Sequence, residues 1–116
     1  MPPRRERLGR GDRVRSSRDY RRVGQGGVRR VSRHFVVLVA PRFQGVPGDP
    51  PRLGITASHR VGPAVERNQV KRRIRECFRR NRSRFPAESD VVVIARTGSP
   101  GLSGAQVQRE ILELFR

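Results

Sequence analysis

The residues best suited to chemistry in this 116-residue sequence are the cations gathered between residues 60 and 84. That stretch carries 10 Lys or Arg residues, and its only acids are Glu66 and Glu76. Ammonium and guanidinium groups hold phosphate through charge-assisted hydrogen bonds, and arginine can form two of them in parallel. The chemistry that this stretch predicts is the binding of a polyphosphate, such as a nucleic acid backbone.

A second block of positive charge lies at the N-terminal end of the chain. Residues 1–33 carry 12 Arg against Glu6, Asp12 and Asp19, and the residues outside the two blocks sum to no net charge. The formal charge of +17 is therefore concentrated in two places. Such clustering is typical of a nucleic acid partner, whereas a merely soluble surface mixes charges of both signs.

Residues that could form a hydrolytic site are scarce. Cys77 is the only cysteine, so the chain can form neither an internal disulfide nor a cysteine metal cluster, and we expect this thiol to pack in the core. The two histidines, His34 and His59, are far apart in the sequence, and no paired carboxylates accompany them. We therefore expect no catalytic residue and no metal or cofactor bound by the protein alone.

The cations of the first block are predicted to lie on a helix over residues 62–82. Gly62 and Pro63 can open this helix, since proline at the first helical position loses no hydrogen bond, and Pro86 follows its end. At about 100° per residue, one side is apolar and should face a sheet: Val70, Ile74, Cys77 and Phe78. The opposite side gathers polar and cationic residues: Asn68, Lys71, Arg72, Arg75, Arg79 and Arg82.

This cationic side of the helix is expected to bind a partner. An ordinary solvated face pairs Glu with Lys or Arg at i,i+4 spacing, but the wheel places no acid on this side. Neighbouring like charges repel one another, and the phosphates of a partner would relieve that repulsion.

The remaining elements predict one α+β domain over residues 16–116, preceded by a flexible basic arm over residues 1–15. A short helix should start at Ser16 or Ser17 and end at Val23, before a glycine cluster. Ser103 should cap a final helix. Strands are expected over residues 28–32, 34–40, 52–57 and 90–95. The predicted order is αβββαβα, a four-stranded sheet packed with helices.

Nothing in the sequence indicates a membrane partner. No stretch reaches the roughly 18 apolar residues of a membrane span, and the charged N-terminus has no apolar signal core. We expect a cytoplasmic protein, and no protein partner is evident.

One segment closely resembles a known family. Residues 58–76, Ser-His-Arg-Val-Gly-Pro-Ala-Val-Glu-Arg-Asn-Gln-Val-Lys-Arg-Arg-Ile-Arg-Glu, follow the signature of the bacterial ribonuclease P protein subunit. Residues 19–20, 35–37, 52–55 and 91–96 agree with the family's flanking pattern, so the resemblance covers about residues 14–116. It implies a left-handed crossover between the third and fourth strands, although right-handed connections prevail in about 98% of proteins.

The resemblance also implies a function and its residues. In that family an RNA subunit cleaves precursor tRNA with bound Mg²⁺, while the protein helps to hold the RNA and the 5′ leader. The residues implied to contact the catalytic RNA are Arg60, Arg67, Asn68, Lys71, Arg72 and Arg75, and Arg79 shares their helix face. A cleft for the single-stranded leader is expected at Tyr20, Phe35, Val36 and Leu38, since bases stack on aromatic rings.

Four positions depart from the family pattern. Gln69 stands where a second Arg of an Arg-Asn-Arg motif is usual, and His59 replaces a usual basic residue. Gly24 and Leu38 stand where the family commonly has aromatic residues. We therefore expect a leader cleft that stacks bases less strongly.

Two other functions are compatible with the charge alone. A ribosomal or other structural RNA-binding protein can have a similar composition and fold, and only the Arg-Asn-x-x-Lys-Arg helix argues against it. A DNA-coating protein is also compatible, but no groove-reading motif is recognisable in the sequence.

Overall fold

The computed structural model describes residues 13–14, 16–42 and 45–116 of the chain. In chain order, the main elements are α1 (Ser17–Gly26), β1 (Val28–Val31), β2 (Phe35–Pro41), β3 (Arg52–Thr56), α2 (Ala64–Arg80), β4 (Ser89–Ala95) and α3 (Gly104–Glu113). Two short 3₁₀ turns, η2 (Arg82–Arg84) and η3 (Ser99–Gly101), follow α2 and β4. This order confirms the predicted α+β fold.

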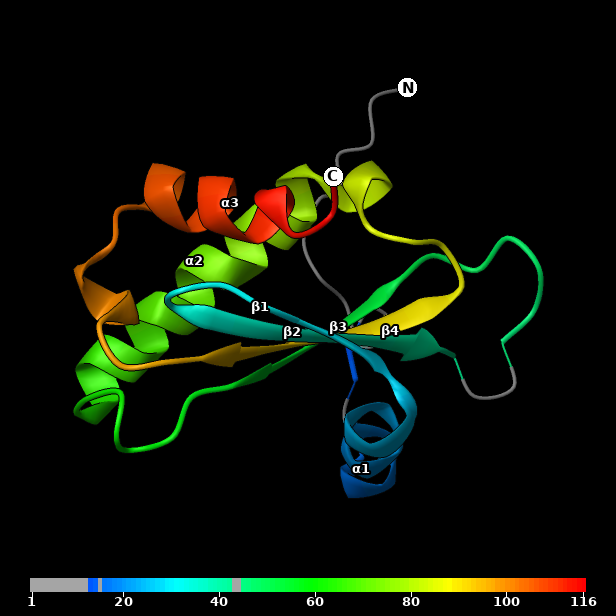
Figure 1. Cartoon of the computed structure of the whole chain (residues 1–116), viewed down its shortest axis with the longest axis horizontal. Helices are drawn as coiled ribbons and strands as arrows, with labels where there is room; N and C mark the ends of the chain where they lie inside the picture. The colour runs from blue at the N-terminus through cyan, green and yellow to red at the C-terminus, as the bar shows by residue number, and fades with distance from the viewer. Residues whose placement is uncertain (1–12, 15, 43–44) are drawn as a thin grey trace.

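The strands form a mixed sheet in the order β1-β2-β4-β3. β2 lies antiparallel to both β1 and β4, with Phe35 opposite Ala95, whereas β3 lies parallel to β4, with Leu53 opposite Val91. Helices α2 and α3 lie together on one side of the sheet, and α1 lies on the other side near one end (Figure 1). The sheet therefore has one well-covered face and one partly open face.

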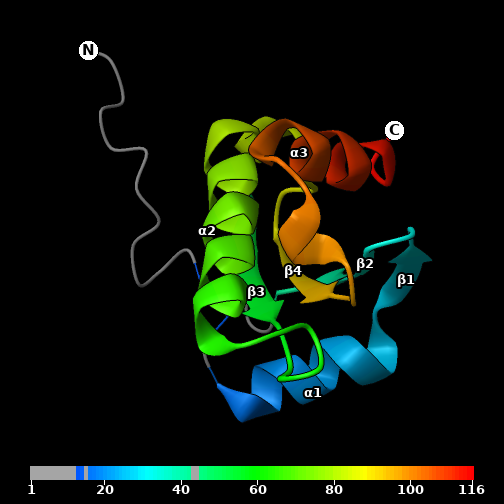
Figure 2. The same ribbon diagram turned by 90° about the vertical axis from the view of Figure 1, so that its left-hand side faces the viewer.

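The connection from β3 through α2 to β4 is left-handed, as the resemblance implied. In Figure 2 these two strands point toward the viewer, β4 lies to the right of β3, and α2 stands to the left of both strands and extends above them. The path from β3 over α2 to β4 thus turns clockwise as it advances toward the viewer. General physics favours the opposite hand, so this feature could not have been derived from strand order alone.

The main core lies between the sheet and helices α2 and α3. The apolar side of α2 is buried as predicted, with Val70, Ile74, Cys77 and Phe78 each no more than 2% exposed. Burial raises the pKa of the Cys77 thiol to about 12, which makes it a packing residue instead of a reactive thiolate.

Helix α1 is longer than predicted. The Ser16 hydroxyl accepts a hydrogen bond from the Asp19 N–H, which confirms the expected cap, but the helix continues through Gly24 and Gly26. It ends where Gly27 approaches β2, because a Cβ there would lie 2.9 Å from the Val39 carbonyl oxygen. Gly27, the last glycine of the cluster, is therefore the one that the packing of α1 against β2 requires, because a side chain there would not fit.

The predicted flexible arm lies outside the described residues except for Arg13 and Val14. These two residues run along the free edge of β3, where the Val14 N–H donates to the Leu53 carbonyl at 2.9 Å and Arg13 forms a parallel bridge with Leu53. Val14 is 3% exposed. Both residues are therefore part of the folded domain.

Candidate nucleic-acid interface

The outer side of α2 carries the cations that the helical wheel placed there. Lys71 and Arg75 are partly exposed, and Asn68 and Arg72 are exposed. Neither Lys71 nor Arg75 is hydrogen-bonded or ion-paired to any residue that the structure describes. Arg67 is more constrained, since its Nε donates to the Gly62 carbonyl at 3.1 Å.

The positive charges on this helix face act on one another. Burial, followed by the like charges of Arg13 and Arg72, lowers the pKa of Arg75 below its usual range. The guanidinium nonetheless remains charged at neutral pH, because arginine titrates far above it. A bound anion would remove this repulsion, so the face is electrostatically prepared for phosphate.

One expectation about this face is wrong. The wheel placed no acid beside Arg79, but Glu76, one turn back, forms an ion pair with it and also accepts a hydrogen bond from Arg80 Nε at 2.8 Å. Residues three and four apart on a helix reach each other although they differ in angle. Both arginines lower the pKa of Glu76, so its carboxylate stays ionised and neutralises part of the charge of Arg79.

Arg60 belongs to a second cationic hollow, which the sequence did not reveal. The hollow has a volume of about 290 Å³ and lies where the parallel strands β3 and β4 end. Its described lining is Arg33, Ser58, Arg60, Val61, Ala95, Arg96 and Thr97. Carboxyl ends of parallel strands commonly hold ligands, and that rule could have pointed to Arg96. Arg33 lies in the turn between β1 and β2, and no pattern in the sequence indicated that it would join this hollow.

The structure brings together three of the four residues that were expected to form a leader cleft. Tyr20, Val36 and Leu38 share the sheet face that α1 partly covers, and Tyr20 and Leu38 pack against the same small buried cluster there. Phe35 is a correction: it is fully buried in the main core, on the opposite face with Val37. Successive strand residues point to opposite faces, so Phe35 cannot share a cleft with Val36.

Arg29 of β1 is a further residue on the open sheet face. It lies directly across from Leu38 in the antiparallel pair, and cross-strand partners project to the same face. It is exposed and has no hydrogen bond or ion pair to a described residue. A cation therefore stands beside Leu38, where the family pattern commonly has an aromatic ring.

Tyr20 is held at the free edge of β3 by its hydroxyl. The Ile55 N–H donates a hydrogen bond to Tyr20 Oη at 3.1 Å, which satisfies a backbone group of the edge strand. The ring lies against Gly54, where a Cβ would come within 2.8 Å of the phenolic oxygen. Only glycine at position 54 therefore leaves room for the Tyr20 ring on the strand.

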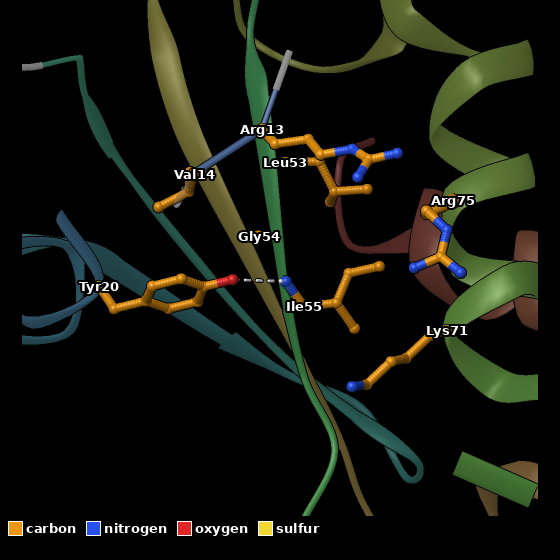
Figure 3. Close-up of a pocket in the computed structure, with 8 residues that line it drawn as sticks. All are labelled: Arg13, Val14, Tyr20, Leu53, Gly54, Ile55, Lys71 and Arg75. Atoms are coloured by element: carbon orange, nitrogen blue, oxygen red, sulfur yellow. Dashed lines mark hydrogen bonds between the residues drawn. The ribbon is translucent and has the colours of Figure 1, made fainter. Parts of the chain in front are cut away.

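A pocket of about 160 Å³, here called the β3-edge pocket, joins the two predicted surfaces. Its described lining is Arg13, Val14, Tyr20, Leu53, Gly54, Ile55, Lys71 and Arg75. Figure 3 shows Tyr20 approaching β3 from one side while Lys71 and Arg75 extend toward it from α2 on the other. The tyrosine that was assigned to one surface and the cations that were assigned to the other thus meet at one strand.

A buried carboxylate attaches α1 to the sheet near Tyr20. Asp90 at the start of β4 is fully buried, and it accepts hydrogen bonds from Arg52 Nε at 2.7 Å and Arg52 Nη2 at 2.8 Å. Arg22 of α1 forms an ion pair with the same carboxylate, and Asp19 lies 3.6 Å from Arg52. The hydrogen bond to Asp90 is the main cause that raises the pKa of Arg52. This network sets where α1 lies on the sheet.

The described residues offer no donor set for a metal ion. Across residues 13–14, 16–42 and 45–116, no three His, Cys, Asp or Glu side chains come together as metal ligands would. Within the same ranges, no helix is both long and apolar enough to cross a bilayer.

Comparison with known proteins identifies a family for this chain. Residues 8–116 match the family model described as ribonuclease P. A ribonuclease P protein component from Syntrophus aciditrophicus is 39% identical over 104 residues, which cover 90% of this chain and 84% of the relative. Another, from Syntrophobacter fumaroxidans, is 43% identical over 107 residues, with 90% and 85% covered.

Solved structures give the same result. The RNase P protein of Staphylococcus aureus superimposes with a TM-score of 0.79 at 33% identity, over 89% of this chain and 91% of that one. The Thermotoga maritima RNase P protein, in complex with 1-(4-fluorophenyl)-2-thiourea, gives a TM-score of 0.78 at 33% identity, over 90% and 98%.

Proposed function

Because the chain belongs to the ribonuclease P protein family, we propose that it is the protein subunit of a ribonucleoprotein that removes the 5′ leader from precursor tRNA. The holoenzyme is an endoribonuclease that acts in the cytoplasm. The RNA subunit carries the catalysis, and the protein binds that RNA and the leader of the substrate.

The observation that carries this proposal is the group of cations around Lys71, Arg72 and Arg75 on the outer side of α2. Lys71 and Arg75 have no partner among the described residues, and Arg72 is exposed beside them. This face binds the catalytic RNA, together with Arg60, Arg67, Asn68 and Arg79. Arg79 contributes less than its neighbours, because Glu76 already neutralises part of its charge.

The open sheet face beside α1 holds the single-stranded leader. Tyr20 and Leu38 supply the apolar surface, and Arg29 adds a planar guanidinium on which a base can stack. The hollow at Arg33, Arg60 and Arg96 continues the cationic path along the ends of β3 and β4.

Magnesium belongs to the RNA in this proposal. The acid next to the α2 cations is Glu76, and its carboxylate is already occupied by Arg79 and Arg80. Mg²⁺ prefers several oxygen ligands in an octahedral arrangement, and the phosphates and waters of the RNA would supply most of them.

The direct test is an assay of leader removal with the cognate catalytic RNA at low Mg²⁺, with and without the purified protein. We expect the protein to accelerate cleavage strongly and, by itself, to cleave nothing. No acceleration and no binding of the catalytic RNA would overturn the assignment, as would cleavage by protein alone after rigorous nuclease removal. Copurification with ribosomal subunits instead of this RNA would favour a ribosomal role.

A further inference from the structure

The hydroxyl of Tyr20 has an unused donor. A phenol has one hydrogen to donate and lone pairs that accept, and here the oxygen accepts from the Ile55 N–H. No described residue accepts the phenolic hydrogen. Burial raises the pKa of Tyr20, so the hydroxyl keeps its proton at neutral pH and stays a donor in the β3-edge pocket.

The other polar groups in the β3-edge pocket favour an anion. Lys71 and Arg75 line it with Arg13, and no carboxylate is among its described lining residues. The pocket has a volume of about 160 Å³, which is enough for several water molecules. That space can hold one phosphate group.

The surroundings of the pocket favour a single strand over a duplex. The Tyr20 ring that borders the pocket also packs in the apolar cluster with Val23 and Val92 on the α1 side of the sheet. A cationic pocket beside an apolar surface matches a strand that presents a phosphate and an unstacked base together. A duplex buries its bases and would leave the apolar surface without a partner.

We propose that the β3-edge pocket binds one backbone phosphate of the single-stranded leader, with the Tyr20 hydroxyl as a hydrogen-bond donor and Lys71 and Arg75 as its cations. The inference rests on the proposed function and assigns Tyr20 a contact through its hydroxyl in addition to its ring. It also links the surface for the leader to the surface for the catalytic RNA.

The test neutralises leader phosphates one at a time as methylphosphonates and measures binding of each precursor to the holoenzyme. In wild type, one position should weaken binding about tenfold, as expected for a hydrogen bond to a charged group. Tyr20→Phe, which keeps the ring, should weaken the unmodified precursor by about the same factor. In the Tyr20→Phe holoenzyme, the methylphosphonate at that position should weaken precursor binding by less than about twofold, because the hydroxyl that contacts this phosphate is already absent.

Two further variants separate this contact from a change in folding. With Lys71→Gln, the methylphosphonate at the same leader position should no longer weaken precursor binding. This variant keeps the hydrogen bond between Ile55 and Tyr20, so the effect would not come from a loosened α1. Arg116→Gln, which removes one charge that lies outside the pocket and is paired with Glu113, should keep the full wild-type sensitivity.

The outcomes are distinct. If wild type accelerates leader removal but no leader position is coupled to both Tyr20 and Lys71, the phosphate site is wrong and the proposed function stands. If Tyr20→Phe weakens leaderless tRNA or the isolated catalytic RNA equally, the pocket holds a phosphate of the catalytic RNA and the assignment to the leader fails. If wild type neither binds the catalytic RNA nor accelerates cleavage, the proposed function itself fails.

Discussion

The N–H of Ile55 donates a hydrogen bond to the hydroxyl of Tyr20 at 3.1 Å, and this bond attaches helix α1 to the free edge of the sheet. β3 is an edge strand of the sheet, so the Tyr20 hydroxyl satisfies a backbone group at that edge. Tyr20 is therefore both a structural residue of the α1–β3 junction and a residue of the β3-edge pocket.

Tyr20→Ala should affect both the stability of the fold and the binding of precursor tRNA, and the two effects can be measured separately. The free energy of unfolding should fall by about 1–2 kcal/mol, because a partly buried ring and one hydrogen bond are lost. Precursor binding should weaken by a further ~1–3 kcal/mol through lost stacking, at the low end of that range since Gly24 and Leu38 are not aromatic. Denaturant titration and binding constants for precursor and mature tRNA measure both. Equal losses for the two RNAs would contradict a leader cleft at Tyr20.

Arg75→Ala and Arg72→Ala should weaken assembly with the catalytic RNA more than Arg79→Ala does. Each of the first two removes a charge-assisted contact of ~1.5–3 kcal/mol where it is desolvated. Arg79 is already paired with Glu76, so its contribution to binding should be smaller. Titration of each variant against the catalytic RNA without substrate measures this order. An effect of Arg79→Ala as large as that of Arg75→Ala would refute the neutralisation by Glu76.

Asp90→Asn should be among the most destabilising polar substitutions in the domain. It removes a fully buried carboxylate and leaves Arg22 and Arg52 without their shared anion. Breaking a buried pair costs about 3–5 kcal/mol, and the partial exposure of both arginines favours the low end. Asp49→Asn is the matched control, since Asp49 lies 3.8 Å from Arg42 at a more exposed site and should cost under ~1 kcal/mol. Thermal and denaturant unfolding of both variants provides the comparison.

Glu110→Gln should reduce the sensitivity of folding to acid. Glu110 of α3 accepts hydrogen bonds from the His34 N–H at 2.6 Å and from Ser32, and its Oε1 lies 2.8 Å from His34 Nδ1. These contacts outweigh desolvation and lower the pKa of Glu110 below its ordinary value of 4.5. A lowered folded-state pKa means that the carboxylate stabilises the fold above that ordinary value and loses this effect as the pH falls through the folded value.

Unfolding curves between about pH 3 and pH 7 test this linkage. Wild type should exceed Glu110→Gln in stability at pH 7, and the difference should narrow as the pH drops below 4.5. Glu113→Gln is the control, because Glu113 pairs only at the surface, with Arg116. A difference that is constant with pH would show that the ionised carboxylate is not what binds the turn at His34.

RNA affinity should depend steeply on salt. Six cations from the α2 face and the second hollow are in position to contact phosphates: Arg33, Arg60, Lys71, Arg72, Arg75 and Arg96. About six phosphate contacts predict a loss of affinity on the order of 10³-fold between 50 and 200 mM salt, somewhat less for a single strand. Binding constants across that range measure the slope, and a nearly flat response would show that these cations do not form the binding surface.

The sequence determined the elements whose information is local. The buried side of α2 followed from helical spacing, the Ser103 cap from the residues around it, and the family from the signature at residues 58–76. Each depends on residues within a few turns of one another, where backbone geometry alone fixes which side chains share a side.

Tertiary structure alone decided the features that join distant segments. The apolar run of β2 does not indicate which of its residues face which side of the sheet, so Phe35 was assigned to a cleft when it lies in the core. The glycine cluster was expected to end α1 before residue 24, but Gly24 and Gly26 lie within the helix. The backbone comes close to β2 only at Gly27 among these three glycines. Glu76 offsets part of the positive charge that Arg79 presents to a partner. A helical wheel gives the angles between side chains but does not show which of them are long enough to meet.

The β3-edge pocket shows the same limit most clearly. Tyr20, Gly54 and Lys71 belong to a helix, a strand and another helix, and no local pattern connects them. They meet because β3 is the edge strand and the Asp90 network holds α1 against it. Sequence periodicity specifies which side of an element is buried, but which elements become neighbours is decided by packing of the whole chain, and this site depends on those neighbours.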